Sequence, residues 1–538
     1  MSFEIRHRDM LARIGKLQTK SGAIETPVLL PVINPATQPI SPRAMREEYG
    51  CQGLITNAYI LRKQRGEEAE KKGVHRLLDF DGVIMTDSGA YQILVYGKVD
   101  VTPEEIVGYQ ERIATDIATI LDIPTSWNTV RDHARLTVGE TIKRAKRLTK
   151  TKTREDILWV GPIQGGQYLD LVAHSARQMG KLPFQIHALG SPTTVMEQYL
   201  FDTLVDMILA AKMNMPLERP LHLFGAGHPF MFALAVALGC DMFDSAAYAI
   251  YARQNRYMSE YGTSRINELE YFPCHCPICS RITPKDLMQM PARERQEVLA
   301  KHNLHASLAE VRRVKQAIIE GRLWEHLEGR VHAHPALLQA VKRLRKYEDY
   351  IEHHSPVAKD RGLFFFSGLG LSRPEVTRYR KNLTERFRPR RKSTTLILLP
   401  QPAQRPFHRG EKIKRLTQEL LKGSPSEPEP FHVCVYAAPF GVVPLELDEV
   451  YPLSQYEIAT PVDLETIEYV SKRVKEYIAD SSYKKVVLVE DEAWRGKVSA
   501  ACKGFRRKGL SITVLSVKEK SDDKVLDDLM NAVRNLVA

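Results

Sequence analysis

An alternation of short apolar runs and helix-like segments between Gln52 and Ala249 is the feature that most limits how this chain can fold. Each apolar run ends in Gly, Asp or Asn, as in GLITNAY, GVIMTDSGAY and LWVGPIQGG, and segments such as HARLTVGETIKRAKRL separate several of the runs. Short buried strands that alternate with helices are typical of a parallel α/β sheet. The number of units favours a (β/α)8, TIM-like barrel over an open doubly wound sheet, and neither a G-x-G-x-x-G fingerprint nor a P-loop occurs.

Acids and glycines occupy the ends of the predicted strands. In a (β/α)8 barrel the C-terminal ends of the strands meet at one mouth, which holds the functional residues. The residues at these ends are Asp87, Asp122, Gln164, Gly190, Gly225 and Asp244. Asp87 and Asp244 have the alternative role of a helix N-cap, most plainly Asp87, which a Ser-Gly pair follows. Three carboxylates that converge on one mouth predict a site there.

Three cysteines lie close together in the segment PCHCPIC: Cys274, Cys276 and Cys279. Zn²⁺ prefers four thiolate or imidazole ligands in a tetrahedron, and His302 in the following segment can supply the fourth. His275 and His305 are rival fourth ligands, although His275 stands between two cysteines and would struggle to reach the same ion. Four protein ligands close the site, so we expect one structural zinc ion; a chance group of buried thiols is the alternative.

The pattern changes after the segment GLFFFSGLG. Pro-rich links then separate strand-like segments, such as KKVVLVED and LSITVLSV, from helix-like ones. We expect a barrel over residues 1–360 with a zinc subdomain at about 270–310, a basic connecting segment over 361–392, and a smaller α/β accessory domain over 393–538.

The net charge of +12 at pH 7 suits a polyanionic partner, with a solvated basic surface as the alternative. Residues 378–392 concentrate eight basic side chains, and Tyr379 and Phe387 interleave with them. Such a segment suits phosphate contacts, although a solvated helix face followed by a linker is the alternative. The candidate nucleic-acid contacts are Arg378, Arg380, Lys381, Arg388, Arg390, Arg391 and Lys392.

The N-terminal segment carries charge of both signs and no apolar stretch typical of a secretory signal, and no apolar run approaches the length of a membrane span. A protein that keeps clustered thiols fits a reducing compartment. We therefore expect a cytoplasmic protein with no membrane partner.

Several motifs together resemble those of the archaeal tRNA-guanine transglycosylases of the archaeosine type. They occur in that family's order over about the first 350 residues: TDSGAYQ, LDIPT, GPIQGG, LHLFGAGHP, GCDMFDSAAYAIYAR, PCHCPIC and HNL. The FDSAAY…YAR segment and the Cys/His motif are the most specific. The segment VVPLELDEVYPLSQYE also resembles the accessory region of this family and of its paralogue, archaeosine synthase.

The resemblance implies a reaction. Members exchange the guanine at position fifteen of the tRNA D-arm for 7-cyano-7-deazaguanine, the first step of archaeosine formation on tRNA, and they are zinc-bearing barrels that often work as dimers. The implied partners are tRNA, guanine, 7-cyano-7-deazaguanine and a second copy of the chain. The glycosidic bond is broken and remade at one carbon with retention, so a covalent glycosyl-Asp intermediate is the economical route.

The resemblance also implies roles for single residues. Asp244 is the nucleophile and Asp87 the general acid/base, although some descriptions of the family make Asp87 the nucleophile. Asp241 is a competing acid, but three residues along a strand put it on the opposite face. A carboxylate at position 122 would accept from N1–H and the amine of a guanine-like ring, and two aromatic rings would stack on that base. The substrate-contacting set is Asp122, Gln164, Gly190, Tyr91, Phe224 and Ser88.

Two departures from the family pattern stand out. The segment SWN follows DIPT where the family usually has a Pro-Pro-Asp run, so we expect a different loop near the base. The family often carries a C-terminal PUA domain, whereas this sequence ends in the helix-like VLDDLMNAVRNLVA. Either a separate PUA-domain protein or the basic segment 378–392 would then hold tRNA, and we favour the separate protein.

Two other functions fit parts of the pattern. An archaeosine synthase-type paralogue would act on the nitrile, but such paralogues tend to lose the barrel acids, and no Pro-Cys-x-x-Lys-Pro-Tyr-like segment occurs in the C-terminal half. A non-catalytic tRNA-binding subunit would carry an electrostatic penalty for acids at a phosphate-binding mouth. Both alternatives are disfavoured by the retention of Asp87, Asp122 and Asp244.

Overall fold

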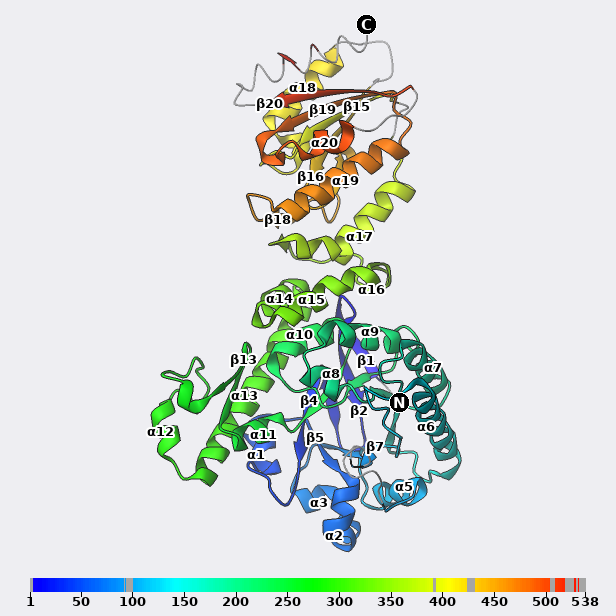
Figure 1. Cartoon of the computed structure of the whole chain (residues 1–538), viewed down its shortest axis with the longest axis vertical. Coiled ribbons are helices and arrows are strands. Elements are labelled where there is room, and N and C mark those ends of the chain that lie inside the picture. Colours follow the sequence, from blue (N-terminus) through cyan, green and yellow to red (C-terminus); the bar gives the residue numbers. More distant parts are fainter. Residues whose placement is uncertain are drawn as a thin grey trace. The chain divides into compact units, whose positions relative to one another are not determined.

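The computed structural model describes residues 3–90, 92, 100–389, 393–422, 431–503, 509–517, 527–528 and 531. Its contacts divide the chain into two compact units, Met1–Lys346 and Tyr347–Ala538, and Figure 1 labels their helices and strands. Four residues of the predicted site lie outside the described residues: Tyr91, Arg390, Arg391 and Lys392.

Parallel strands form a closed barrel in the first unit, which confirms the predicted fold class. The last strand pairs with the first, with Asp244 opposite Leu30, and this pairing closes the ring. Leu30, Ile55, Met85 and Val160 belong to the apolar core of the barrel. The barrel strands are β4 (Val28–Ile33), β5 (Gly53–Asn57), β6 (Val83–Asp87), β7 (Ile117–Thr119), β8 (Leu158–Ile163), β9 (Ile186–Leu189), β10 (Leu221–Leu223) and β11 (Met242–Ser245).

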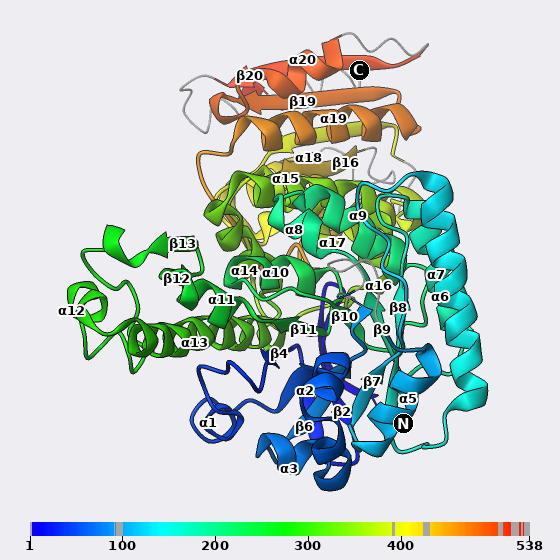
Figure 2. The same ribbon diagram turned by 60° about the horizontal axis from the view of Figure 1, so that its bottom comes forward.

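Helices follow the strands and surround the barrel (Figures 1 and 2). Local sequence signals explain several of them: the Thr102 hydroxyl and the Glu105 carboxylate form a capping box, and Pro103 opens the same helix at the position where its missing N–H costs nothing. The helices are α1 (Pro42–Glu47), α2 (Ala58–Lys72), α3 (Val74–Leu78), α5 (Pro103–Arg112), α6 (Arg131–Thr151), α7 (Leu169–Gly180), α8 (Thr193–Glu197), α9 (Phe201–Lys212), α10 (Pro229–Ala237) and α11 (Ala247–Arg253).

A three-stranded antiparallel sheet precedes the barrel. Its strands are β1 (Phe3–Asp9), β2 (Ala12–Gln18) and β3 (Ala23–Thr26). After the barrel, the hairpin of β12 (Arg256–Ser259) and β13 (Gly262–Arg265) leads through the Cys-rich turn to α12 (Pro284–Gln289) and the long helix α13 (Ala292–Ile319). Helices α14 (Leu323–Arg330) and α15 (Pro335–Arg343) complete the unit.

The second unit contains a five-stranded sheet in the order β17-β16-β15-β19-β20, in which only β17 runs antiparallel to its neighbour. Its strands are β15 (Thr395–Pro400), β16 (Phe431–Ala437), β17 (Gly441–Pro444), β19 (Lys485–Asp491) and β20 (Ser511–Val517). A smaller parallel pair joins β14 (Leu363–Phe365) and β18 (Tyr456–Ile458). The helices are α16 (Glu348–His354), α17 (Pro374–Lys381), α18 (Glu411–Lys422), α19 (Leu464–Asp480) and α20 (Lys497–Lys503).

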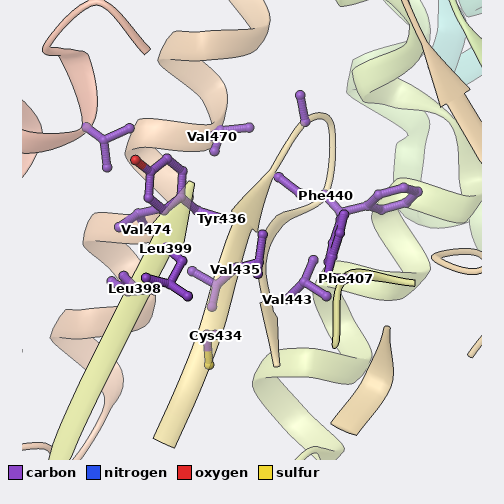
Figure 3. Packing of buried hydrophobic residues seen from close by; sticks show 14 of the residues in the cluster. Leu398, Leu399, Phe407, Cys434, Val435, Tyr436, Phe440, Val443, Val470 and Val474 are labelled. Carbon is purple, nitrogen blue, oxygen red and sulfur yellow. The ribbon is translucent and has the colours of Figure 1, made fainter. Parts of the chain in front are cut away.

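The sheet of the second unit has a continuous apolar core. Figure 3 shows Tyr436 of β16 beside Val470 and Val474 of helix α19, with Leu398 and Leu399 of β15 close by. Alternating strands and helices in this part of the sequence therefore form a second α/β layer. Among the described residues of both units, none of the helices has the length and apolar character needed to cross a bilayer.

Candidate active site

A cavity of about 690 Å³ opens at the carboxyl ends of the barrel strands. All six strand-end residues that the sequence singled out line this cavity: Asp87, Asp122, Gln164, Gly190, Gly225 and Asp244. They come from six consecutive strands or from the turns that follow them, because parallel strands present all their C-terminal ends at one mouth. The predicted convergence of the three acids is present in the structure.

Asp244, near the end of β11, is held by one of its oxygens. Its Oδ1 accepts a hydrogen bond from the backbone N–H of Gly225 at 3.0 Å and lies 2.9 Å from Nε2 of His222 on the neighbouring strand β10. Sequence reasoning missed His222, which stands two residues before the predicted Phe224. The alternation of side chains along a strand is the signal that could have placed it in the barrel interior.

Asp87, at the end of β6, lies in a network with two amide side chains. Nδ2 of Asn57 donates to Oδ2 of Asp87 at 2.9 Å and to Oε1 of Gln92 at 2.8 Å, and the N–H of Gly89 donates to the same Asp87 oxygen at 3.3 Å. Burial, followed by the negative charges of Asp122 and Asp244, raises the pKa of Asp87 to about 7. This carboxyl group can therefore either hold or accept a proton near neutral pH.

Asp122 and Gln164 form a second polar group in the cavity. Nε2 of Gln164 donates to Oδ2 of Asp122 at 2.5 Å, while Oε1 of Gln164 accepts from the backbone N–H of Thr125 at 3.0 Å. Burial raises the pKa of Asp122 to about 6, and the Gln164 hydrogen bond opposes this shift. A Cβ atom at Gly190 would lie 2.2 Å from Nε2 of Gln164, so only glycine leaves this amide in place.

The remaining predicted substrate contacts differ in their positions. Phe224 lines the cavity, and its ring lies against that of His222 with centroids 4.7 Å apart. Ser88 is fully buried and is not among the residues that line the cavity. Trp127, from the SWN segment that departs from the family pattern, lines the cavity beside Pro124.

Asp241, the competing acid on the same chain segment, lies elsewhere. Its carboxylate accepts from Nε and a terminal nitrogen of Arg13 at 2.7 and 2.8 Å, and from the backbone N–H of Leu221 at 2.8 Å. It is buried and is not among the cavity residues. Asp241 therefore anchors β2 to the barrel, whereas Asp244 faces the cavity.

The Cys-rich turn and helix α13 together form a cluster that can hold one metal ion. The ligand atoms of Cys274, Cys276, Cys279 and His302 all lie within 4.8 Å of one another. Nε2 of His302 lies 2.9 Å from the carbonyl oxygen of Met258, which makes Nε2 the N–H donor and leaves Nδ1 as the ligand atom. Consistent with this, Nδ1 faces the sulfurs of Cys279 and Cys276 at 3.2 and 3.5 Å. The His305 ring instead lies tilted against that of Tyr49, with the ring centroids 4.5 Å apart.

The basic side chains of helix α17 are engaged in ion pairs within the second unit. Arg378 pairs with Glu352 at 2.7 Å, and Arg380 pairs with Glu348 at 2.8 Å. Lys381 pairs with both Asp349 and Glu352 of helix α16. Arg388 instead donates to the backbone carbonyls of Thr384 and Phe387, so its charge is not neutralised by these acids.

The fold and the cavity together are those of a (β/α)8-barrel enzyme with an acid-lined pocket at the carboxyl ends of its strands. The profile of a family described as queuine tRNA-ribosyltransferase matches residues 9–336. The chain belongs to this family, and it is an enzyme of the pentosyltransferase class. A domain of unknown function matches residues 376–533, which fall in the second unit.

Two similar proteins carry the name tRNA-guanine(15) transglycosylase. The protein of Methanocaldococcus jannaschii is 43% identical over 496 residues, which cover 90% of this chain and 72% of the relative. The protein of Saccharolobus solfataricus is 42% identical over 499 residues, covering 91% and 97% of the two chains. The similarity therefore extends across both units.

Proposed function

We propose that this enzyme exchanges the guanine at position 15 of tRNA for 7-cyano-7-deazaguanine, through a covalent glycosyl-Asp intermediate, as the first step of archaeosine formation. The names of the relatives support the guanine and its position. The observation that carries the proposal is the meeting of Asp87, Asp122 and Asp244 in one cavity that has room for a purine and a sugar. This arrangement supports base exchange over action on a nitrile or non-catalytic tRNA binding.

Asp244 is the nucleophile in this mechanism. One of its oxygens bonds to the anomeric carbon of the ribose while the bond to guanine breaks, and the bonding electrons go to the departing ring nitrogen. The incoming base then attacks the same carbon and releases the carboxylate. Asp244 is suited to this role because it faces the cavity and forms no ion pair with Lys or Arg within the described part of the chain.

Asp87 moves the proton. With a pKa of about 7 it is partly protonated near neutral pH, so it can give a proton to the ring nitrogen of the leaving guanine. The resulting carboxylate then takes a proton from the incoming base, which returns Asp87 to its starting state. Nδ2 of Asn57 donates to this carboxyl group and to Gln92, and the hydrogen bond limits the rotation of the Asp87 carboxyl group.

Asp122 selects the base. When ionised, its carboxylate can accept from the N1–H and the exocyclic amine of guanine or 7-cyano-7-deazaguanine. Gln164 and the backbone near Gly190 face the carbonyl edge of the base, and Phe224 stacks on its face, with Tyr91 proposed for the other face. Glycine at position 190 leaves room for the Gln164 amide, which a Cβ atom would displace.

We further propose that the Cys274–His302 cluster binds one structural Zn²⁺ ion. Three thiolates, one imidazole and a carbonyl that fixes the histidine tautomer fit the ligand preference of zinc. Metal analysis of the purified chain is expected to find one zinc per chain. His302→Ala should lose it, whereas His305→Ala, a matched change on the same helix, should keep it.

The tRNA contacts, a separate PUA-domain protein, a second copy of the chain and a cytoplasmic location stay predictions. Among the predicted basic contacts, Arg388 supports phosphate binding best, because the charges of Arg378, Arg380 and Lys381 are matched by acids. The size of the purified chain in solution, measured with and without tRNA, tests the second copy.

The test of the proposed reaction is incorporation of radiolabelled guanine into tRNA. The purified chain should incorporate label, and Asp244→Ala should incorporate none while its affinity for tRNA changes by no more than about threefold, because tRNA is held mainly through its phosphates. Asp132→Ala, a change at an exposed acid whose side chain is 92% accessible, is the control and should behave as the parent chain. Full incorporation by Asp244→Ala would contradict the assignment of the nucleophile.

A further inference from the structure

The side chain of His222 lies in the barrel interior next to the proposed nucleophile. On the parallel strands β10 and β11, His222 is in register with Met242, so Met242, Asp244 and His222 project from the same face of the sheet. Met242 belongs to the apolar core of the barrel, and His222 is fully buried. The His222 ring therefore meets the Asp244 carboxylate below the floor of the cavity, out of contact with solvent.

The contacts of its two ring nitrogens define the state of His222. An ionised carboxylate only accepts hydrogen bonds, so Nε2, 2.9 Å from Oδ1 of Asp244, must carry the hydrogen. The other nitrogen, Nδ1, is buried and has no hydrogen-bond partner among the described residues. A proton on Nδ1 would be an unsatisfied buried donor on a charged ring, whereas the neutral Nε2–H tautomer avoids this cost.

The two oxygens of Asp244 are consequently inequivalent. Oδ1 accepts from both His222 and the backbone N–H of Gly225, while no described residue donates to Oδ2. The carboxylate faces the cavity that would hold the ribose. Two donors on one oxygen fix the plane of the carboxylate and leave the second oxygen free to react.

We propose that His222 is a positioning residue for the nucleophile: together with the Gly225 N–H it holds Oδ1, so that Oδ2 of Asp244 forms the bond to the ribose anomeric carbon. This inference rests on the proposed function and adds to it a specific oxygen and the residue that orients it. As the Oδ2–carbon bond forms, the carbon–nitrogen bond to guanine breaks, and the base nitrogen takes the electron pair and the proton of Asp87. His222 keeps its proton throughout and never touches substrate.

The neighbouring strand offers a matched control. His187 on β9 is as fully buried as His222. Its Nε2 lies 3.4 Å from a terminal nitrogen of Arg219, and it is not among the cavity residues. Replacing His187 therefore removes a buried imidazole of the same kind without altering the contacts of Asp244.

The experiment compares His222→Leu, His222→Gln and His187→Leu in the full chain. For each, thermal unfolding gives the folded fraction, single-turnover reactions with tRNA give the rate at which the trapped protein–tRNA adduct forms, and steady-state exchange at varied guanine concentration gives the KM for guanine. His222→Leu should slow adduct formation about 10- to 100-fold, the effect of losing a hydrogen bond to a charged group, with KM changed by no more than about twofold. His187→Leu should keep the parent rate per folded molecule even where it unfolds at a lower temperature.

Rescue separates orientation from packing. The Gln side chain brings an amide N–H to about the place of Nε2, so His222→Gln should recover most of the rate, whereas His222→Asn, which reaches only the place of Nδ1, should stay slow. This pair gives the same test if His222→Leu does not fold. A parent-like rate in His222→Leu, or equal rates in the Gln and Asn variants, would overturn the role of His222 while leaving base exchange standing. A parent chain that neither exchanges guanine nor forms an adduct would instead overturn the proposed function, and this inference with it.

Discussion

The buried acids at the two ends of the barrel have different kinds of partner. At the amino end, Asp241 accepts two hydrogen bonds from the Arg13 guanidinium, and Asp116, just before β7, pairs with His75 at 3.1 Å. At the carboxyl end, Asp87 and Asp122 form no ion pair with Lys or Arg within the described residues. Their partners there are the uncharged amides of Asn57 and Gln164.

This difference separates structural from chemical use of a carboxylate. Removing an ion from water costs free energy that a guanidinium at 2.7 Å can offset, so Asp241 joins β2 to the barrel as one half of an ion pair. Amides satisfy hydrogen bonds without cancelling the charge, so the carboxyl-end acids keep raised pKa values and open lone pairs. The stabilising contacts lie at one end of the barrel and the reactive groups at the other.

Among the variants that keep both reacting acids, Asp122→Asn has the largest expected effect. The change replaces an acceptor of two charge-assisted hydrogen bonds, each worth about 1.5–3 kcal/mol, by a group with only one acceptor. We expect kcat/KM for guanine to fall about 10²- to 10⁴-fold in the tRNA exchange assay. For hypoxanthine, which lacks the exocyclic amine, kcat/KM should fall by a smaller factor from the parent chain to the variant. Unchanged guanine kinetics would mean that Asp122 does not bind the base.

A substitution of Asp241, at the amino end of the barrel, should change the free energy of unfolding. Asp241→Ala leaves Arg13 buried without its carboxylate, and we expect the free energy of unfolding to fall by about 3–5 kcal/mol in urea denaturation. The exchange rate per folded molecule should stay within about twofold of the parent rate. Asp244→Ala should lose exchange completely with a smaller loss of stability, about 1–3 kcal/mol, because the buried Nε2–H of His222 loses its acceptor. If both variants lose activity and stability alike, the contrast between the two ends does not hold.

The pH dependence of stability tests the raised pKa of Asp87. A carboxyl group with a higher pKa in the folded state is penalised when it ionises, so the parent chain should lose stability as pH rises from about 4 through 7. The Asp87→Asn variant has no carboxyl group at this position, so it should not show this loss of stability. The stability of the variant relative to the parent should therefore grow by about 2–4 kcal/mol over this range and level off above it, as measured by thermal unfolding at each pH. A difference independent of pH would show that Asp87 has an ordinary pKa.

The smallest expected effect concerns the basic segment of the second unit. Arg388→Ala should weaken tRNA binding about two- to fivefold and reduce the salt dependence of binding by about one phosphate contact. Arg378→Ala breaks the pair with Glu352 and should lower the stability of its unit instead, with the same salt dependence as the parent. Filter binding over a series of salt concentrations measures both. Equal slopes for parent and Arg388→Ala would exclude Arg388 as a phosphate contact.

The fold could be predicted from the sequence because buried parallel strands have a strong pattern, yet β4 escaped the pattern that began at Gln52. Pro31 lies inside β4, opposite Ser245 of β11, and a proline normally argues against a central strand because it lacks the N–H donor. Pro31 is buried inside the barrel wall, and the free energy gained by burying β4 outweighs the proline's disfavour for a central strand. Local propensity was overridden by the closure of the barrel.

The site residues that stand at strand ends could be predicted from the sequence. The residues that hydrogen-bond to them from neighbouring strands could not. Asp87, Asp122 and Asp244 stand out in the sequence, but Asn57 and His222 acquire meaning only from the register that brings them beside those acids. Charge counting had a similar limit for Arg378 and its neighbours. A run of basic residues does not reveal that acids of helix α16 neutralise it.

Mapping the trapped tRNA–protein adduct by proteolysis and mass spectrometry tests the central claim most directly. Asp87 and Asp244 fall on different tryptic peptides, and fragment ions distinguish Asp244 from Asp241 on its own peptide. We predict that the ribose-linked mass is carried by Asp244 alone. A modified Asp87 with an unmodified Asp244 would contradict the account of which acid forms the bond.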